Sequence, residues 1–215
     1  MKAIVLLGAP GAGKGTTAEA VKGRTAFLHV STGDMLRRAV KNGTDLGRRA
    51  ESYMKQGELV PDELMTQLID ERLVKEGPEA LYVFDGYPRT VNQAEQLEQS
   101  LERHGGRLDR VFLLDAPRPV LIERLTGRRI CRQCGRNYHV VNVPPAKDGV
   151  CDACGGELYQ RSDDTEDTIV NRLEVYERQT HSLIARYEAQ GLLVRVDAGQ
   201  QADRMAADVM AELPE

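Results

Sequence analysis

The chain lacks several features that would mark a membrane, exported or nucleic-acid-binding protein. Among its 215 residues, no apolar run approaches the roughly 18–20 residues that span a bilayer. The formal net charge is only −4, which indicates neither a general nucleic-acid surface nor a membrane surface. The N-terminal apolar run is short and leads directly into a glycine-rich motif, unlike a signal peptide. We therefore expect a cytoplasmic protein with a mature N-terminus and no membrane or nucleic-acid partner.

Histidine is also scarce, and the four present are isolated from one another. The sequence therefore offers no obvious catalytic histidine. We expect His29, at the end of an apolar run, to be structural, and His139 is a conceivable neighbour of the cysteine cluster described below. Internal repeats and low-complexity tracts are absent, and the length suits one α/β protein with a substantial core.

Strand-like and helical patterns alternate along the chain. This alternation predicts a parallel sheet with helices on both faces. The apolar strand-like runs are Ala3–Leu7, Ala26–Val30, Leu81–Phe84, Val111–Leu114 and Leu192–Val196. Ligands of open α/β sheets bind beyond the carboxyl ends of the strands, and three of these ends carry suggestive polar residues: Gly8 onward, 31–34 and 85–89.

Several helix starts are well marked. Residues Thr90 to Gln93 form a capping-box pattern, and Pro61 and Pro119 suit first helical positions. Asp62 and Glu63 would then fall in a first helical turn, where acidic side chains favour the helix dipole.

A glycine-rich stretch, Gly8–Thr16 (GAPGAGKGT), follows the first apolar run and precedes a helical pattern. A strand, a glycine-rich turn and a helix N-terminus form a phosphate cradle, because backbone N–H groups and the helix dipole favour an anion. Lys14 adds a mobile charge for the outer phosphates. The P-loop pattern GxxxxGK[ST] holds through Lys14, but Gly15 replaces the usual Ser or Thr and the hydroxyl comes at Thr16. This departure affects the expected magnesium contact, and a turn without a ligand is the alternative.

A second signal is the segment 85–89 (DGYPR) after a buried apolar strand. Asp85 at the tip of the strand can orient magnesium-bound water near a triphosphate. Arg89 offers a fork to a phosphate. The alternative is a plain strand-to-helix turn with a solvated arginine.

The strand–helix rhythm breaks between Gly127 and Asp164, where all four cysteines lie. They form two CxxC pairs, each followed by glycine, with the spacing of a four-thiolate zinc site: Cys131, Cys134, Cys151 and Cys154. Two disulfides are the alternative, which a cytoplasmic setting disfavours. Zinc or a similar soft divalent metal would be structural, because four cysteines leave no open position, and it would replace a core that the insert is too short to build.

Arginines flank this insert. Arg128 and Arg161 lie near its two roots and could face one cleft, and Arg172 follows on the next helix. A mobile flap that carries arginines over a phosphate site would exclude water and neutralise charge. Solvated surface arginines are the alternative for any one of them.

Taken together, these motifs resemble those of the adenylate kinase family. Gly8–Thr16 is similar to the family's P-loop, including the Gly-Lys-Gly-Thr ending. Residues 85–90 resemble a family signature in which Tyr87 replaces a commoner Phe. The cysteine-bearing insert resembles the LID of the bacterial long form, and two segments resemble the region that binds the nucleoside monophosphate: 31–37 and 57–62. The resemblance covers essentially the whole chain.

The resemblance implies a P-loop nucleoside monophosphate kinase fold, with a five-stranded parallel sheet, helices on both faces and a small zinc-binding LID insertion. It also implies a monomer, because two hinged flaps must move freely. The implied parts are a CORE (1–30, 61–126 and 165–215), an NMP-binding segment (31–60) and a LID (127–164).

The resemblance further implies the site residues. Those that would hold ATP are Gly11, Ala12, Gly13, Lys14, Gly15, Thr16, Arg124, Arg128, Asn137, Tyr138 and Gln200. Gln200 replaces a Lys common in the family, a change that a backbone contact would tolerate. Those that would hold AMP are Thr32, Arg37, Glu58, Leu59, Val60, Gly86, Tyr87, Pro88, Arg89, Gln93, Arg161 and Arg172. Thr32 and Gln93 would read the adenine, and the arginines would grip the phosphate.

The implied catalytic residues surround the transferring phosphate: Lys14, Arg89, Arg128, Arg161 and Arg172. Asp34 and Asp85 would order magnesium-bound water. The implied reaction is the reversible transfer of the γ-phosphate of MgATP to AMP, which gives two ADP and balances the adenine nucleotides. No protein base is needed, because an AMP phosphate oxygen is ionised near neutral pH; alignment, charge neutralisation and water exclusion suffice.

Two other functions remain open at this point. One is a kinase of UMP/CMP or GMP with the same fold, since base choice depends largely on the resemblance. The other is a zinc-ribbon nucleic-acid-binding NTPase or switch. Such a ribbon would need a basic patch with aromatics, whereas basic residues in the insert are offset by Asp148, Asp152, Glu157, Asp163 and Asp164.

Overall fold

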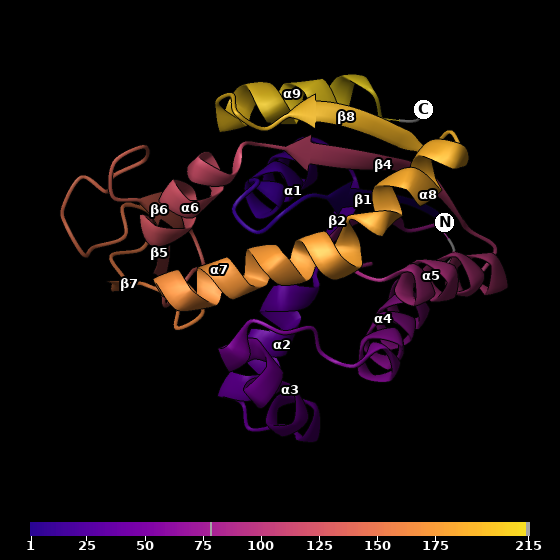
Figure 1. The fold of residues 1–215 in the computed structure, drawn as a ribbon, viewed down its shortest axis with the longest axis horizontal. Helices are drawn as coiled ribbons and strands as arrows, with labels where there is room; N and C mark the ends of the chain where they lie inside the picture. Colours follow the sequence, from indigo (N-terminus) through magenta and orange to yellow (C-terminus); the bar gives the residue numbers. More distant parts are fainter. Residues whose placement is uncertain (78, 214–215) are drawn as a thin grey trace.

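The computed structural model describes residues 1–77 and 79–213. A parallel sheet with strand order β2-β3-β1-β4-β8 forms its centre (Figure 1). The expected parallel α/β architecture is confirmed, and only β4 differs clearly from its expected start at residue 111. The strands are β1 (Lys2–Leu7), β2 (Phe27–Ser31), β3 (Leu81–Asp85), β4 (Arg107–Asp115) and β8 (Leu193–Asp197).

Helices cover both faces of this sheet, because alternate side chains of each strand point to opposite sides. On β1, Ala3 and Val5 join one apolar core, and Ile4 and Leu6 join the other. The first core is closed by α4 (Asp62–Glu76), α5 (Val91–Arg103) and α8 (Ser182–Ala189). The second core is closed by α1 (Lys14–Arg24), α6 (Arg118–Thr126), α7 (Glu166–Val175) and α9 (Ala202–Ala211). Among the described residues, no helix combines the length and apolarity needed to cross a bilayer.

Two short helices project from the sheet at the lower edge of Figure 1: α2 (Thr32–Lys41) and α3 (Asp45–Gln56). They pack on each other, and α3 also meets α7, where Asn171 Nδ2 donates to the carbonyl of Gln56 at 2.5 Å. A five-residue π-helical turn, η1 (Tyr176–Thr180), connects α7 to α8. The long α7–η1–α8 segment thus runs across the molecule from the insert to the core (Figure 1).

The cysteine insert forms a second, antiparallel sheet with the order β6-β5-β7. Its strands are β5 (Arg128–Cys131), β6 (Asn137–His139) and β7 (Leu158–Tyr159). The apolar centre of the insert is small, with Cys131, Tyr138 and Cys151 buried and Leu158 packed against them. This agrees with the expectation that the insert has little core of its own.

The helix starts are close to the expected ones. Thr90 Oγ1 accepts from the Gln93 N–H at 3.1 Å, as a capping box requires. The Gln93 side chain, however, accepts from the N–H of Arg89 at 2.8 Å rather than from that of Thr90. Pro61 immediately precedes α4, and Pro119 is the second residue of α6.

Candidate functional site

The glycine-rich turn lies between the carboxyl end of β1 and the start of α1. Gly8, Gly11 and Gly13 have positive φ angles of 144°, 86° and 95°. A Cβ on Gly8 would lie 2.4 Å from the Leu114 carbonyl oxygen, so no side chain fits there. The turn closes around Lys14, whose Nζ donates to the carbonyls of Gly8 and Ala9 at 2.7 and 2.9 Å.

Burial lowers the pKa of Lys14 from 10.5 to about 7. The carboxylate of Asp85 raises this pKa, while the nearby charges of Arg89, Arg172 and Arg128 lower it further. A buried ammonium among guanidinium groups is short of negative charge. The turn is therefore electrostatically prepared for an anion such as a phosphate.

Asp85 ends β3 beside this turn. A Cβ on Gly15 would lie 3.3 Å from the Asp85 carboxylate, which gives a spatial reason for the glycine at that position. Burial alone would raise the pKa of Asp85, but His29 and Lys14 hold it below its usual value. His29 Nε2 lies 3.5 Å from Asp85 Oδ2, and His29 Nδ1 pairs with Glu19 Oε1 at 2.8 Å. His29 thus lies between two carboxylates, those of Glu19 and Asp85.

A pocket lies between α2, α3 and the residues after β3. Most of the predicted AMP residues line it: Thr32, Arg37, Glu58, Leu59, Val60, Gly86, Arg89, Gln93 and Arg172. Tyr87 is buried and is not part of the pocket lining. The residues come from four separate parts of the sequence, and the fold brings them to one place. Leu36, Met54 and Met65 add an apolar lining suited to a flat ring.

Thr32 Oγ1 and Arg89 Nε both donate to the carbonyl of Gly86, at 2.9 and 2.8 Å. These bonds fix the polar wall of the pocket. Gly57 ends α3 with a φ of 75°, and a Cβ there would lie 2.8 Å from Arg172 Cγ. The glycine therefore lets α7 approach the pocket closely.

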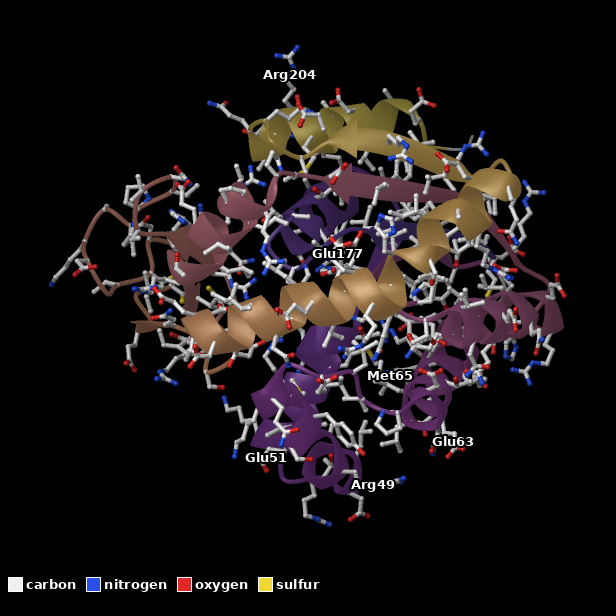
Figure 2. All side chains as sticks on the ribbon, viewed as in Figure 1. Arg49, Glu51, Glu63, Met65, Glu177 and Arg204 are labelled. Carbon is white, nitrogen blue, oxygen red and sulfur yellow. The ribbon has the colours of Figure 1, made fainter. Side chains whose placement is uncertain are left out.

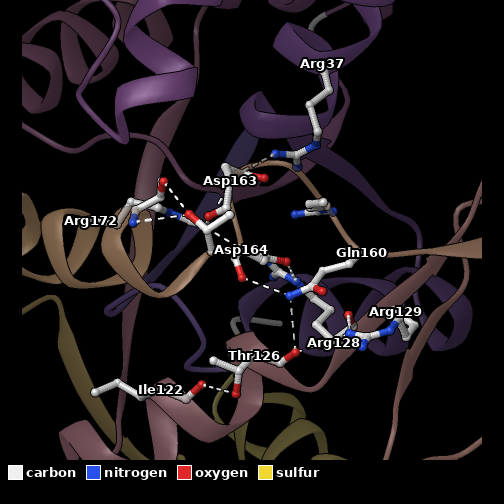
Figure 3. A network of polar contacts seen from close by, with 12 residues as sticks. Arg37, Ile122, Thr126, Arg128, Arg129, Gln160, Asp163, Asp164 and Arg172 are labelled. Atoms are coloured by element: carbon white, nitrogen blue, oxygen red, sulfur yellow. Dashed lines mark hydrogen bonds and ion pairs between the residues drawn. The ribbon is translucent and has the colours of Figure 1, made fainter.

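A network of arginines and aspartates joins the insert to α7 (Figure 3). The Asp164 carboxylate is fully buried and accepts from Arg128 Nε at 2.8 Å and Nη2 at 2.5 Å. It also accepts from Arg172 Nη1 at 3.1 Å. Arg172 Nη1 donates to the Asp163 carbonyl at 2.9 Å, and Arg37 lies 4.0 Å from the Asp163 carboxylate. Three predicted functional groups, those of Arg37, Arg128 and Arg172, are therefore held together by two aspartates.

Arg161 extends this network to α2, because its Nη2 donates to Asp34 Oδ1 at 3.4 Å. Its Nε is buried and has no hydrogen-bond partner among the described residues. Burial and the nearby charges of Arg37 and Arg128 lower the pKa of Arg161 to about 10, and burial with Arg172 lowers that of Arg89 to about 10. A buried unpaired donor and crowded cations both indicate an anion site.

Asp34 itself lies at the start of α2. Its carboxylate accepts from Arg37 at 2.6 Å. Burial would raise its pKa, but the charges of Arg37 and Arg161 lower it.

Arg124 on α6 and Gln200 meet where α6 contacts the segment after β8. Arg124 Nη1 donates to the Ala198 carbonyl at 2.7 Å, and Nη2 donates to the Gln200 carbonyl at 3.3 Å. Gln200 Nε2 donates to Asp208 at 2.5 Å, so the Gln200 side chain points to α9. These two residues, both among those predicted to hold ATP, are thus adjacent.

The four cysteine sulfurs lie within 4.8 Å of one another. Cys131 Sγ and Cys154 Sγ are 3.4 Å apart, and Cys134 Sγ and Cys151 Sγ are 3.6 Å apart. A tetrahedron with Zn–S bonds of about 2.3 Å has edges of about 3.8 Å, whereas a disulfide requires about 2.05 Å. All four cysteines are free. The donor set therefore fits a closed four-thiolate metal site.

The local turns explain this cluster. Gly135 N donates to the Cys131 carbonyl at 3.0 Å, and Gly155 N donates to the Cys151 carbonyl at 2.8 Å. The two CxxC pairs thus form equivalent tight turns.

Two neighbours of the cluster have defined roles. Tyr138 is buried, its hydroxyl accepts from the Asp152 N–H at 2.8 Å and lies 3.4 Å from Cys151 Sγ. His139 is not a metal neighbour, because its Nδ1 accepts from two backbone N–H groups and its Nε2 contacts the Glu123 carbonyl. Asn137 is exposed at the start of β6.

The sequence did not identify the acidic residues that pair with the basic and amide side chains of the site. From the sequence, Asp163 and Asp164 were identified only as charges that disfavour nucleic acid, and Asp62 only as a helix-start residue at the end of the segment 57–62. Their partners are far away in sequence, so no local pattern could reveal the pairing. The Arg-Ser-Asp-Asp run from Arg161 is the only signal that two acids follow a candidate phosphate-binding arginine.

The chain matches a known protein family over most of its length: the model described as "Adenylate kinase" aligns with residues 6–192. The chain belongs to the adenylate kinase family.

Individual members of the adenylate kinase family are similar over almost the full length of this chain. The adenylate kinase of Caldicellulosiruptor bescii is 52% identical over 92% of this chain and 92% of its own. That of Moorella thermoacetica is 54% identical over 92% of this chain and 91% of its own. That of a Geobacillus species is 50% identical over 96% of this chain and 95% of its own. The family expected from the sequence motifs is thus confirmed.

Proposed function

We propose that this protein catalyses the reversible transfer of the γ-phosphate of MgATP to AMP, giving two ADP, and so helps balance the adenine nucleotides of the cell. One observation carries the proposal: the P-loop and the pocket after β3 meet at a cluster of buried cations. Lys14 comes from the P-loop, Arg89 from the pocket, and Arg172 from α7. Family membership supports the adenine nucleotides as substrates.

In this proposal the protein aligns two phosphates and neutralises their charge. The AMP phosphate attacks the γ-phosphorus directly, because its oxygen is already ionised near neutral pH. Arg89 and Arg172 hold the attacking phosphate, and Lys14 and Arg128 meet the charge that spreads over the transferring group. Arg161, with its unpaired Nε, adds a further donor. Closure of the insert over the site excludes water and so favours transfer over hydrolysis.

The chain has residues suited to hold two metal ions, magnesium and zinc. Magnesium bound with ATP would neutralise the charge of its phosphates, and Asp34 and Asp85 would hold its water ligands. The pKa values of both carboxyls are lowered, so both are ionised at neutral pH. The four cysteine thiolates would hold zinc as a structural ion, because their tetrahedron leaves no position for a substrate.

We further propose the three-part division given above, with residues 31–60 and 127–164 as parts that move on the rest. The antiparallel sheet of the insert and the pair α2–α3 are separate from the central sheet, which supports this division. A monomeric, cytoplasmic enzyme remains our expectation.

The proposal is tested by phosphoryl transfer from MgATP to AMP, GMP, UMP and CMP, measured as ADP formation. We expect fast transfer with a strong preference for AMP. Fast transfer to another nucleotide would keep the mechanism but contradict the base assignment of Thr32 and Gln93. Slow ATP hydrolysis with no acceptor would contradict the proposal, and a salt-dependent shift with an oligonucleotide would favour the nucleic-acid alternative.

A further inference from the structure

The Gln93 side chain is fixed in one orientation by two partners of opposite character. Its Oε1 accepts from the backbone N–H of Arg89 at 2.8 Å, and its Nε2 donates to Asp62 Oδ1 at 2.6 Å. A backbone N–H can only donate and a carboxylate can only accept. The assignment of oxygen and nitrogen in this amide is therefore unambiguous, and rotation by 180° would set two donors and two acceptors against each other.

Asp62 is itself held by three donors. Besides Gln93, Thr90 Oγ1 donates to Asp62 Oδ2 at 3.0 Å and Asn92 Nδ2 donates to it at 2.8 Å. All three donors lie at the start of α5, whereas Asp62 is the first residue of α4. The carboxylate thus has no freedom to turn away from Gln93.

The fixed amide still has one free donor and one free acceptor. A glutamine amide carries two N–H groups and two oxygen lone pairs, and no further hydrogen bond of this side chain occurs among the described residues. Gln93 lines the pocket after β3. A base that reached this amide would therefore meet an acceptor and a donor in a fixed order.

We propose that Asp62 is a positioning residue that sets which base the pocket accepts, by fixing the direction of the Gln93 amide. Adenine offers an amino donor beside a ring-nitrogen acceptor, and guanine offers a carbonyl acceptor beside an N–H donor. A fixed amide matches one order and opposes the other, whereas a freely rotating amide accepts both. This inference rests on the proposed function, in which Gln93 meets the base of the acceptor nucleotide.

The same reasoning separates two groups of bases. Cytosine offers an amino donor beside a ring acceptor, in the order of adenine, and uracil offers the order of guanine. Loss of Asp62 should therefore weaken discrimination between AMP and GMP but leave discrimination between AMP and CMP, which differ in size, largely unchanged. A general loosening of the pocket would change both.

The test is calorimetric binding of AMP, GMP and CMP to the wild-type chain and to Asp62→Ala. We expect the AMP-to-GMP affinity ratio to fall about tenfold in Asp62→Ala, since a matched bidentate pair discriminates about 10- to 100-fold and the Arg89 N–H remains. The AMP-to-CMP ratio should not change. An unchanged AMP-to-GMP ratio, or an equal fall in both ratios, would overturn the proposal.

Two further variants complete the test. Asp70→Ala is the matched control, because Asp70 also bridges α4 to α5, through Ser100 and Arg103, but has no bond to Gln93; its ratios should equal those of the wild type. If Asp62→Ala does not fold, Asp62→Asn should show a smaller fall in the same direction, because its amide can turn either way, and no fall would overturn the proposal. ADP formation by the wild type is measured separately, so failure of the proposed function is distinguished from failure of this inference.

Discussion

Individual buried charges dominate the electrostatics of this site, because a buried charge without a partner raises the free energy of the folded protein. Lys14, Arg89 and Arg161 all have lowered pKa values, mainly because of burial. Aspartates pair some of this charge within the protein, and the buried Arg161 Nε remains unpaired. A bound phosphate would supply the missing negative charge. Substitution of these residues should therefore affect phosphate transfer more than folding.

Arg89→Ala tests whether a buried cation of the pocket acts on phosphate transfer rather than on folding. Arg89 is expected to contact the transferring or accepting phosphate, and removal of one such donor costs about 100-fold or more in turnover. We therefore expect ADP formation to fall by at least that factor while circular dichroism and the melting temperature remain close to those of the wild type. Arg204→Ala is the control, since Arg204 points outward from α9 (Figure 2). Activity within a few-fold of the wild type in Arg89→Ala would remove its assigned role.

The lowered pKa of Lys14 should make both stability and ATP binding depend on pH. In the nucleotide-free protein its pKa is about 7 instead of 10.5, so between these values the unfolded chain binds a proton that the folded chain lacks. This group's contribution to stability therefore rises with pH across that window and is least favourable below about pH 7. ATP phosphates favour the ammonium, so ATP binding should take up a proton and weaken as the pH rises.

Calorimetry at about pH 8 in buffers of different ionisation enthalpy measures this uptake directly. The wild type should take up a substantial fraction of a proton per ATP bound, and Lys14→Met should lose that uptake. Equal proton uptake in the two proteins would show that Lys14 is already charged before ATP binds.

At the scale of elements, the sequence predicted the strands of the central sheet and the cysteine insert, because both have local signals. Apolar runs bounded by glycine-rich turns mark β1 and β3, and the CxxC spacing marks the two equivalent turns. β4 was predicted to begin at Val111 because charged residues interrupt its start, yet it begins at Arg107. There a β-bulge beside Ala3 and Ile4 accommodates the buried Asp109. The bulge depends on pairing with β1, which is distant in sequence, so the residues around Asp109 alone could not predict it.

Metal removal tests the insert as an element. Its apolar centre is small, so the four thiolates and their ion should supply much of its stability. We expect elemental analysis to find one zinc ion per chain and Cys131→Ser to lose it. A loss of about 2 kcal/mol would lower the melting temperature by roughly 4–8 °C. Lys147→Ala, at an exposed position of the insert, should have neither effect. A purified wild-type chain without metal, or a mutant of unchanged melting temperature, would contradict the account.

At the scale of the molecule, three parts of the chain meet at one network. The insert contributes Arg128 and Asp164, α7 contributes Arg172, and α2 contributes Arg37 (Figure 3). The sequence predicted these arginines through the family resemblance, but not the aspartates that join them. Charge pairs between distant segments have no fixed spacing, so only the fold identifies them.

Asp164→Asn tests the network. Removing one partner of a buried pair costs about 3–5 kcal/mol, and we expect about 2 kcal/mol here because Arg128 and Arg172 are 20% and 15% exposed. Denaturant unfolding should show this loss, and turnover should fall because both arginines lose their orientation. Asp167→Asn, at an exposed position in the first turn of α7, should leave both unchanged. Wild-type stability in Asp164→Asn would show that the network does not join the parts.

The central claim is that one site aligns two nucleotides for reversible transfer between them. The most direct measurement supplies ADP and magnesium alone and follows the phosphorus spectrum. The account predicts that ATP and AMP appear in equal amounts until equilibrium, and that Arg89→Ala slows their appearance. Release of inorganic phosphate, or no reaction, would contradict it, because a site that neither returns ATP nor forms AMP from ADP is not a phosphate-transfer site for these nucleotides.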